Sequence, residues 1–211
     1  KYDSVITNPP YMAPNEVEKA YVQKHYLDSK SDLFAVFIET CHSLTKKNAY
    51  QAMITMHSWM FLSSYEKLRN KLLINNTIIN MAHLGARAFD EIGGEVVQTT
   101  TFIFQNNNIK NYQTNFKRLV DYNTQDLKEE EYLKDKNLYI QSSNNFSKIP
   151  GSPIAYWVNK RFIDSFKMKQ LSSYGEIITG ITIGDNNKYL RLWHEVSNKK
   201  IAFSRSDMDE I

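Results

Sequence analysis

The sequence predicts an α/β protein with a largely parallel sheet. Two observations carry this prediction: β-rich runs alternate with amphipathic stretches, and the runs end at polar or proline-containing loops. Hydrophobic residues make up 42% and charged residues 23% of the 211-residue chain, which is the balance of a globular protein. The expected order over the first half is strand, helix, strand, helix, strand, loop, strand.

The first strand is expected over Tyr2–Thr7, and it stops at Asn8 because two prolines follow and proline cannot continue a central ladder. Residues 12–31 are polar, with weak helical character around Glu16–Lys24. Asp32 is a candidate N-cap for the next helix. The apolar positions of that helix follow helical spacing: Leu33, Phe34, Phe37, Ile38, Cys41 and Leu44. Lys46, Lys47 and Asn48 are expected to close it.

The next elements follow the same alternation. A buried strand is expected over Ala49–Met56, and a helix is expected to begin at Ser63 or Ser64. A third strand is expected over Thr77–His83. A loop containing Gly93 and Gly94 then leads to a fourth strand, which is expected over residues 96–104. These elements make residues 1–106 one α/β unit.

The composition changes after residue 106. Residues 107–150 are rich in Asn and Ser around the charged run DLKEEEYLKDK, and they are expected to form a connecting region whose charged run is a solvated helix face. Residues 151–211 are expected to form a further unit with a helix over Ile154–Phe166. The net charge of +3 comes entirely from residues 107–211, and it is compatible with a nucleic-acid partner without requiring one.

Cysteine content, hydropathy and histidine spacing argue against an intramolecular disulfide, a membrane-spanning helix and a metal site. The single Cys41 cannot form an intramolecular disulfide, so a reducing cytoplasm is expected, and its apolar neighbours indicate a small buried side chain. No apolar run approaches the roughly 20 residues that a membrane-spanning helix needs. The five histidines lie far apart without metal-ligand spacing, so no metal site is expected. His57 and His83 fall near strand ends and are interpreted as structural rather than pocket-lining.

The sequence Asn8-Pro9-Pro10-Tyr11 carries chemistry at the end of the first strand. Ligands of open α/β sheets bind beyond the carboxyl ends of the strands. Two prolines stiffen the loop, Asn8 and the Pro9 carbonyl offer two acceptors, and Tyr11 offers a flat ring. Two acceptors and a ring suit a planar group that bears an exocyclic NH2. An adenine extruded from a duplex is such a group. A rigid loop without catalytic function is the alternative.

The segment YDSVITNPPY resembles motif IV of the DNA adenine-N6 methyltransferases of the gamma class. SDLFAVFIE resembles motif V of that class, and HLGARAFDEIGGEVVQTTTFIF resembles motif VIII with the last hairpin. The closest resemblance is to the PglX-type methyltransferases of BREX phage-defence systems, then to the type IIG restriction-modification enzymes. The implied fold is the C-terminal half of a Rossmann-like seven-stranded sheet, that of methyltransferases dependent on S-adenosylmethionine (SAM), followed by the start of a target-recognition region. GITIGDNNKYLRLWHEV resembles that start.

The resemblance implies roles for particular residues. Asn8, Pro9, Pro10 and Tyr11 would form the catalytic loop. Phe89 would stack with Tyr11 on the flipped base. Leu33 and Phe37 would contact the adenine of SAM, the co-substrate. Arg87, Lys188 and Arg191 are candidate DNA contacts, although Arg87 fits a surface ion pair equally well. The glycine-rich cofactor motif is expected upstream of residue 1, so the chain is expected to be an inactive fragment of an active parent.

The implied partners are double-stranded DNA and other restriction or BREX defence subunits, with neither a membrane nor a metal. Two other functions stay open. Glutamine-N5 methyltransferases that act on release factors share Asn-Pro-Pro-Tyr, but they end about a hundred residues after it. A degenerate methyltransferase domain could instead serve as a non-catalytic DNA-binding module. Gly180, Gly184 and Asp185 lack the Gly-Lys-Ser/Thr ending of a phosphate-binding loop and are interpreted as a turn.

Overall fold

The computed structural model describes residues 1–89, 97–176, 188 and 190–201, in two compact units that divide at Met168. The first unit is built on a six-stranded sheet of order β1-β2-β4-β3-β5-β6. Its strands are β1 (Tyr2–Thr7), β2 (Thr45–Met56), β3 (Thr77–Gly85), β4 (Thr99–Gln105), β5 (Thr114–Arg118) and β6 (Leu138–Gln141). Its helices are α1 (Glu16–His25), α2 (Leu33–Leu44), α3 (Glu66–Asn75), α4 (Gln125–Tyr132) and α5 (Lys160–Ser165). The predicted α/β class is confirmed.

The sheet is mixed, so the prediction of a largely parallel sheet is wrong: three of its five strand pairs are antiparallel. The pairs β1–β2 and β3–β5 are parallel, whereas β4 runs antiparallel to both of its neighbours, β2 and β3. The edge strand β6 is also antiparallel to its neighbour β5. Four strands therefore point the same way, and their carboxyl ends meet at one edge of the sheet, which we call the carboxyl edge.

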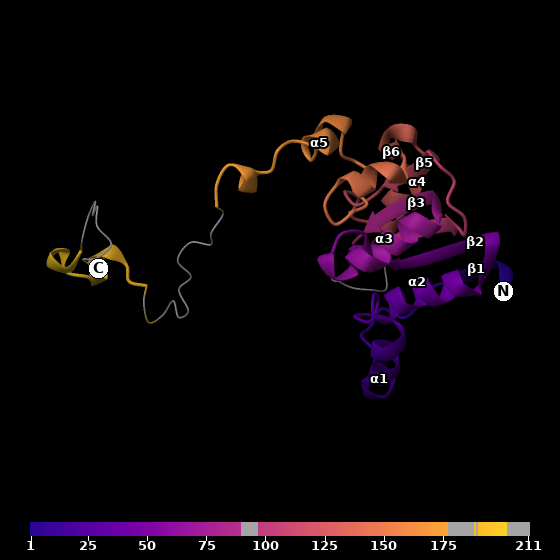
Figure 1. Cartoon of the computed structure of the whole chain (residues 1–211), viewed down its shortest axis with the longest axis horizontal. Coiled ribbons are helices and arrows are strands. Elements are labelled where there is room, and N and C mark those ends of the chain that lie inside the picture. Colours follow the sequence, from indigo (N-terminus) through magenta and orange to yellow (C-terminus); the bar gives the residue numbers. More distant parts are fainter. Residues whose placement is uncertain (90–96, 177–187, 189, 202–211) are drawn as a thin grey trace. The chain divides into compact units, whose positions relative to one another are not determined.

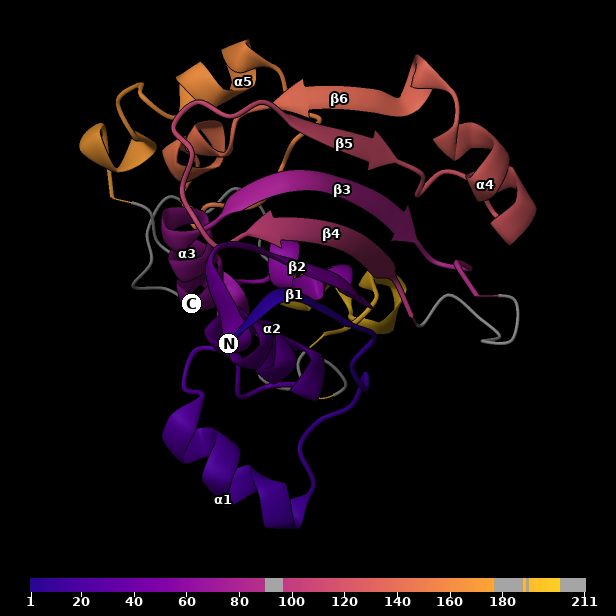
Figure 2. The same cartoon turned by 90° about the vertical axis from the view of Figure 1, so that its right-hand side faces the viewer.

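Several local predictions hold because they depend on neighbouring residues. Asp32 caps α2 by accepting a hydrogen bond from the Phe34 amide at 3.2 Å, and Cys41 lies buried on the inner side of that helix. The helix α1 also forms where weak helical character was expected, with Asn15 and Glu18 in a reciprocal capping box. It projects away from the sheet in both views of the chain (Figures 1 and 2).

Three expectations about element boundaries are wrong. Lys46, Lys47 and Asn48 do not close α2, because the chain enters β2 directly at Thr45 and Lys46 bonds Asp3 of the first strand. The helix expected over Ile154–Phe166 is confined to α5, since residues 154–158 pack irregularly against the core. The fourth strand starts at Thr99. The Gly93–Gly94 loop lies outside the described residues.

Residues 107–150 are not only a connecting region. They add β5 and β6 to the sheet and place α4 beside it (Figure 2), so the first compact unit continues to Met168. The charged run is also not a fully solvated helix face. Lys128 is only 4% exposed, and its Nζ donates to the carbonyls of Leu84 and Leu119 at 2.7 and 2.9 Å. α4 therefore fastens the carboxyl ends of β3 and β5 together.

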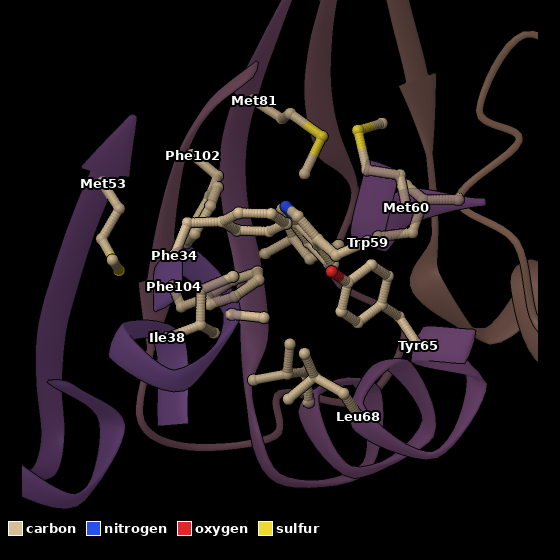
Figure 3. Close-up of a cluster of buried hydrophobic side chains, with 14 of the residues drawn as sticks. Phe34, Ile38, Met53, Trp59, Met60, Tyr65, Leu68, Met81, Phe102 and Phe104 are labelled. Carbon is tan, nitrogen blue, oxygen red and sulfur yellow. The ribbon is translucent and has the colours of Figure 1, made fainter. Parts of the chain in front are cut away.

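The hydrophobic core fills the space between the sheet and the helices α2 and α3. Trp59 is fully buried, and its ring makes edge contacts with Phe102 and Phe104 at 5.3 and 5.9 Å between centroids. Figure 3 shows Phe34, Tyr65 and Leu68 closing around the same ring. Burial of such large side chains contributes about 1.5–3 kcal/mol each. The core thus covers one face of the sheet along the length of β3 and β4.

The second unit, Lys169–Ile211, is described only in part. It contains three short 3-10 helices, Leu171–Ser173, Trp193–Glu195 and Asn198–Lys200. Most of the segment expected to begin target recognition, including Gly180, Gly184 and Asp185, lies outside the described residues. No helix in the described part of the chain is both long and apolar enough to cross a membrane.

Candidate active site at the carboxyl edge

Asn8 lies immediately after β1 at the carboxyl edge, as the sequence predicts. Its side chain is exposed, while the adjacent Pro9 is buried, so the loop is anchored by one proline and presents the amide outward. The Tyr11 hydroxyl donates a hydrogen bond to Asn8 Oδ1 at 2.8 Å. Burial raises the pKa of Tyr11 to about 12, which keeps that hydroxyl protonated and able to donate. Tyr11 therefore sets the orientation of the Asn8 amide.

The Asn8 amide keeps acceptor capacity despite this bond. An amide oxygen has two lone pairs, and Tyr11 uses one of them. Asn8 also lines an open hollow of about 470 Å³ on the face of the sheet opposite α2. The walls of that hollow are mostly apolar side chains from β1, β2 and β4, and one of them, Ile6, is 77% exposed. A planar ligand could therefore approach the free lone pair of Asn8 from solvent.

The loop is tied to the start of α2. The Leu33 amide donates to the Met12 carbonyl at 2.9 Å, so the residue after the motif is fixed at the helix N-terminus. Leu33 is half-buried, and Phe37 packs one turn further along against the same core cluster as Tyr11. Of the two residues expected to contact the cofactor, Leu33 is thus adjacent to the motif loop and Phe37 lies one turn further along α2.

Phe89 lies beyond the carboxyl end of β3. It lines a second hollow, of about 440 Å³, together with Ala88, Lys128 and Tyr132. Tyr132 and Thr101 line both this hollow and the one at Asn8, so the two hollows adjoin. Tyr11 instead packs against the core behind the edge. The structure therefore brings Asn8 and Phe89 to neighbouring hollows without placing the two expected stacking rings face to face.

The start of the Phe89 loop is fixed by a close backbone contact. Gly85 has a φ of +70°, and a Cβ there would approach Val120 to 3.0 Å. This position requires glycine both for its left-handed backbone and for space. Arg87 follows with a φ of +56° and an exposed side chain. Lys188 and Arg191 belong to the second unit and are exposed.

Sequence reasoning missed a histidine pair at the same edge. His57 directly follows β2, and its Nδ1 lies 2.6 Å from Nε2 of His83, near the end of β3. Nδ1 of His83 lies 3.1 Å from the hydroxyl of Tyr156. Burial, then the charge of His57, lowers the pKa of His83 to about 3, and burial lowers the pKa of His57. Both rings are therefore neutral at pH 7. The residues that the structure describes contain no group of three or more His, Cys, Asp or Glu that could hold a metal.

The strand directions, the helices on one face and the loop after β1 make a mixed α/β fold that solved restriction-modification methyltransferase subunits share. A family model described as "Eco57I restriction-modification methylase" matches residues 1–89. A solved type I restriction-modification methyltransferase subunit from Streptococcus thermophilus shares the fold. Its TM-score is 0.54 at 19% identity, and the match covers 75% of this chain and 38% of that one.

Two curated proteins are much more similar in sequence. "Adenine-specific methyltransferase PglX" of Lacticaseibacillus casei is 46% identical over 96% of this chain, and "Adenine-specific methyltransferase BrxX" of Escherichia coli is 48% identical over 93%. Over most of its length the chain is thus similar in sequence to two adenine-specific methyltransferases, as the resemblance of its motifs indicated. It spans 18% and 17% of their lengths.

Proposed function

We propose that the full-length gene product is a DNA methyltransferase that transfers a methyl group from SAM to N6 of a flipped adenine, within a restriction-modification or phage-defence system. The observation that carries the proposal is the exposed Asn8 amide at the carboxyl edge, oriented by Tyr11 at 2.8 Å. The adenine-specific relatives support the same substrate.

Asn8 and Pro9 would activate the amine by accepting its two hydrogen bonds. The lone pair of adenine N6 is delocalised into the ring, so the amine is a poor nucleophile. Acceptance by Asn8 Oδ1 and by the Pro9 carbonyl would favour a tetrahedral nitrogen with its lone pair directed at the methyl donor. Catalysis would then depend on positioning and electrostatics, with direct transfer and no covalent enzyme intermediate. Pro9 and Pro10 would keep the two acceptors in place.

Tyr11 and Phe89 would hold the flipped base by stacking. Tyr11 is partly buried behind Asn8, and Phe89 lines the hollow that adjoins the one at Asn8. An extruded base needs such contacts to offset the loss of stacking in the duplex, and each aromatic contact is worth about 1–3 kcal/mol. Closure of the two rings on the base would require movement of one of them.

The described residues fit part of the SAM molecule. Leu33 and Phe37 offer half-buried apolar surface beside the catalytic loop, which suits the adenine ring of the cofactor. When bound, SAM supplies the electrophilic methyl group. The role of these two side chains would be to hold the adenine end of SAM next to α2.

The proposed partner is double-stranded DNA. Arg87 stands in the loop that carries Phe89, where a cation could meet a phosphate near the flipped base. Lys188 and Arg191 are exposed in the second unit, which we propose begins the target-recognition domain. Other restriction or BREX defence subunits are further proposed partners. DNA and SAM as substrates imply action in the cytoplasm.

The test is methylation mapping of genomic DNA from cells with and without the full-length gene. N6-methyladenine at one recurrent sequence, present only with the gene, is the expected result. Absence of new methyladenine, with DNA binding retained, would favour the non-catalytic binding module instead. Methyl transfer to release factor and not to DNA would favour a glutamine-N5 methyltransferase.

A further inference from the structure

The segment 151–157 is fastened to the carboxyl edge by contacts from three elements. The buried Arg69 of α3 donates to the Gly151 carbonyl at 2.6 Å and to the Ser152 carbonyl at 3.2 Å. The Ile154 amide donates to the Met60 carbonyl at 3.0 Å. The Tyr156 hydroxyl lies 3.1 Å from His83 on β3. A segment with this many buried polar contacts has a defined position.

These contacts hold Trp157 at the carboxyl edge with part of its ring uncovered. Its ring lies perpendicular to that of Tyr156 at 5.0 Å and contacts Phe61 at 5.6 Å. It also lies 6.5 Å from His83, tilted by 30°. Even so, Trp157 remains 41% exposed in the described part of the chain. An aromatic ring that is held rigid and left open is a favourable binding surface, because little side-chain entropy is lost when a ligand covers it.

The ring contacts of Trp157 lead to the histidine pair at the carboxyl edge. Trp157 contacts His83, whose partner is His57, and both histidines have lowered pKa values and are neutral at pH 7. Of the two cations that act on His83, Arg118 pairs with Asp121, and Lys128 is buried with its ammonium bonded to two carbonyls. His57 follows β2, whose parallel neighbour β1 delivers Asn8 to the same edge. The surface therefore lies along the edge at which the target adenine is proposed to bind.

We propose that Trp157, supported by Phe61 and His83, stacks on a base of the DNA substrate next to the flipped adenine. This inference rests on the proposed function and adds a DNA-positioning surface to it. Aromatic stacking accepts any base, because every base has a π-face. Trp157 would therefore be a positioning residue that strengthens DNA binding without reading sequence.

The experiment compares variants of the full-length gene product. Binding to a duplex that contains the mapped methylation site is measured by fluorescence anisotropy at one fixed salt concentration. Trp157→Ala is expected to weaken binding about 5- to 150-fold, the effect of losing one stacking ring. Trp157→Phe should restore most of the affinity. Leu62→Ala removes a neighbouring side chain that is 53% exposed and should bind like wild type.

A readout inside the DNA separates stacking from a folding defect. 2-Aminopurine placed beside the target adenine should be quenched by wild type and by Trp157→Phe, but not by Trp157→Ala. Wild-type affinity and quenching in Trp157→Ala would overturn the inference. Retained DNA affinity with loss of binding to another protein subunit would overturn it as well, in favour of a protein-binding surface. If Trp157→Ala does not fold, Trp157→Leu carries the same test.

Failure of this inference can be told apart from failure of the proposed function. If the wild type methylates adenine and Trp157→Ala binds DNA normally, only the stacking surface is ruled out. If the wild type binds DNA through Trp157 but methylates nothing, the catalytic proposal is ruled out and the stacking surface is retained. Wild type that does not bind DNA overturns both.

Discussion

Two neighbouring regions of the carboxyl edge differ in how they are built. The catalytic loop at Asn8 is local: its key contact joins residues three apart, and the Asn8 amide is exposed. The cluster of His57, His83 and Tyr156 joins residues 26 and 73 apart in sequence, and its rings are largely buried. A group that must bind substrate keeps its polar atoms accessible, whereas the groups that support it have theirs satisfied within the protein. Substitutions in the loop should thus alter activity, and substitutions in the supporting cluster should alter stability.

Arg69→Ala should give the largest loss of stability in the supporting region. Arg69 is 1% exposed and donates to the carbonyls of Trp59, Leu62, Gly151 and Ser152. Each buried acceptor left unpaired costs about 1–3 kcal/mol, so a local loss of at least about 3 kcal/mol is expected. Hydrogen exchange of peptides covering residues 57–62 and 150–157 measures it. Lys67→Ala, on an exposed position of α3, is the control, and equal protection in the two variants would refute this role.

Gly85→Ala should have the next largest effect, because it strains the start of the Phe89 loop. The left-handed backbone costs a non-glycine residue about 1–3 kcal/mol, and the new Cβ would meet Val120 at 3.0 Å. Thermal unfolding should show a lower midpoint than for Gly175→Ala, since a Cβ at Gly175 meets nothing within 4 Å. Identical midpoints for the two variants would show that the contact with Val120 can relax.

Acidification should weaken the histidine pair by an amount that grows as the pH falls. The folded protein holds the pKa of His83 near 3 and lowers that of His57, whereas an unfolded histidine titrates near 6.5. Stability is therefore complete above about pH 6.5 and is lost as the pH falls from there toward 3. For His83 the slope is about 1.4 kcal/mol per pH unit between these values. His83→Gln should reduce the pH dependence of exchange in the 150–157 peptide, and an unaltered slope would contradict this assignment.

Tyr11→Phe should give the smallest effect. The variant keeps the ring and loses only the hydroxyl that orients Asn8, so methyl transfer should slow about 2- to 10-fold, the equivalent of one hydrogen bond. Single-turnover methylation measures this change. Tyr21→Phe, on the exposed surface of α1, should leave the rate unaltered. A rate for Tyr11→Phe equal to wild type would mean that Asn8 is oriented by other contacts.

The fold could be predicted where its signals are local. The strand before Asn8 has the expected limits and the helix after Asp32 has the expected start, because a proline pair and a capping carboxylate act on adjacent residues. β5 and β6 were not predicted, since both are short and their place depends on pairing with β3 and with each other. The irregular path of residues 154–158 was missed for a similar reason: apolar residues at this spacing suit a helix, but Tyr156 instead stacks on Phe116 of β5.

The candidate site likewise could be predicted from sequence only where its residues are neighbours in the chain. Asn8-Pro9-Pro10-Tyr11 could be identified because its chemistry is contained in four consecutive residues. The pairing of His57 with His83 and the burial of Lys128 could not, because each depends on where a distant strand end lies. The positions of His57 and His83 near strand ends were visible in the sequence, but their pairing depends on both strands pointing toward one edge.

The central claim is that the Asn8 amide activates the target amine. The most direct measurement compares methyl transfer from SAM to a duplex carrying the mapped site, by the wild-type full-length gene product and by Asn8→Ala. Loss of a hydrogen-bonding group that acts in the transition state predicts a rate lower by at least about 10²–10³-fold. DNA affinity and thermal unfolding should stay close to wild type. Unreduced turnover by Asn8→Ala would contradict the claim.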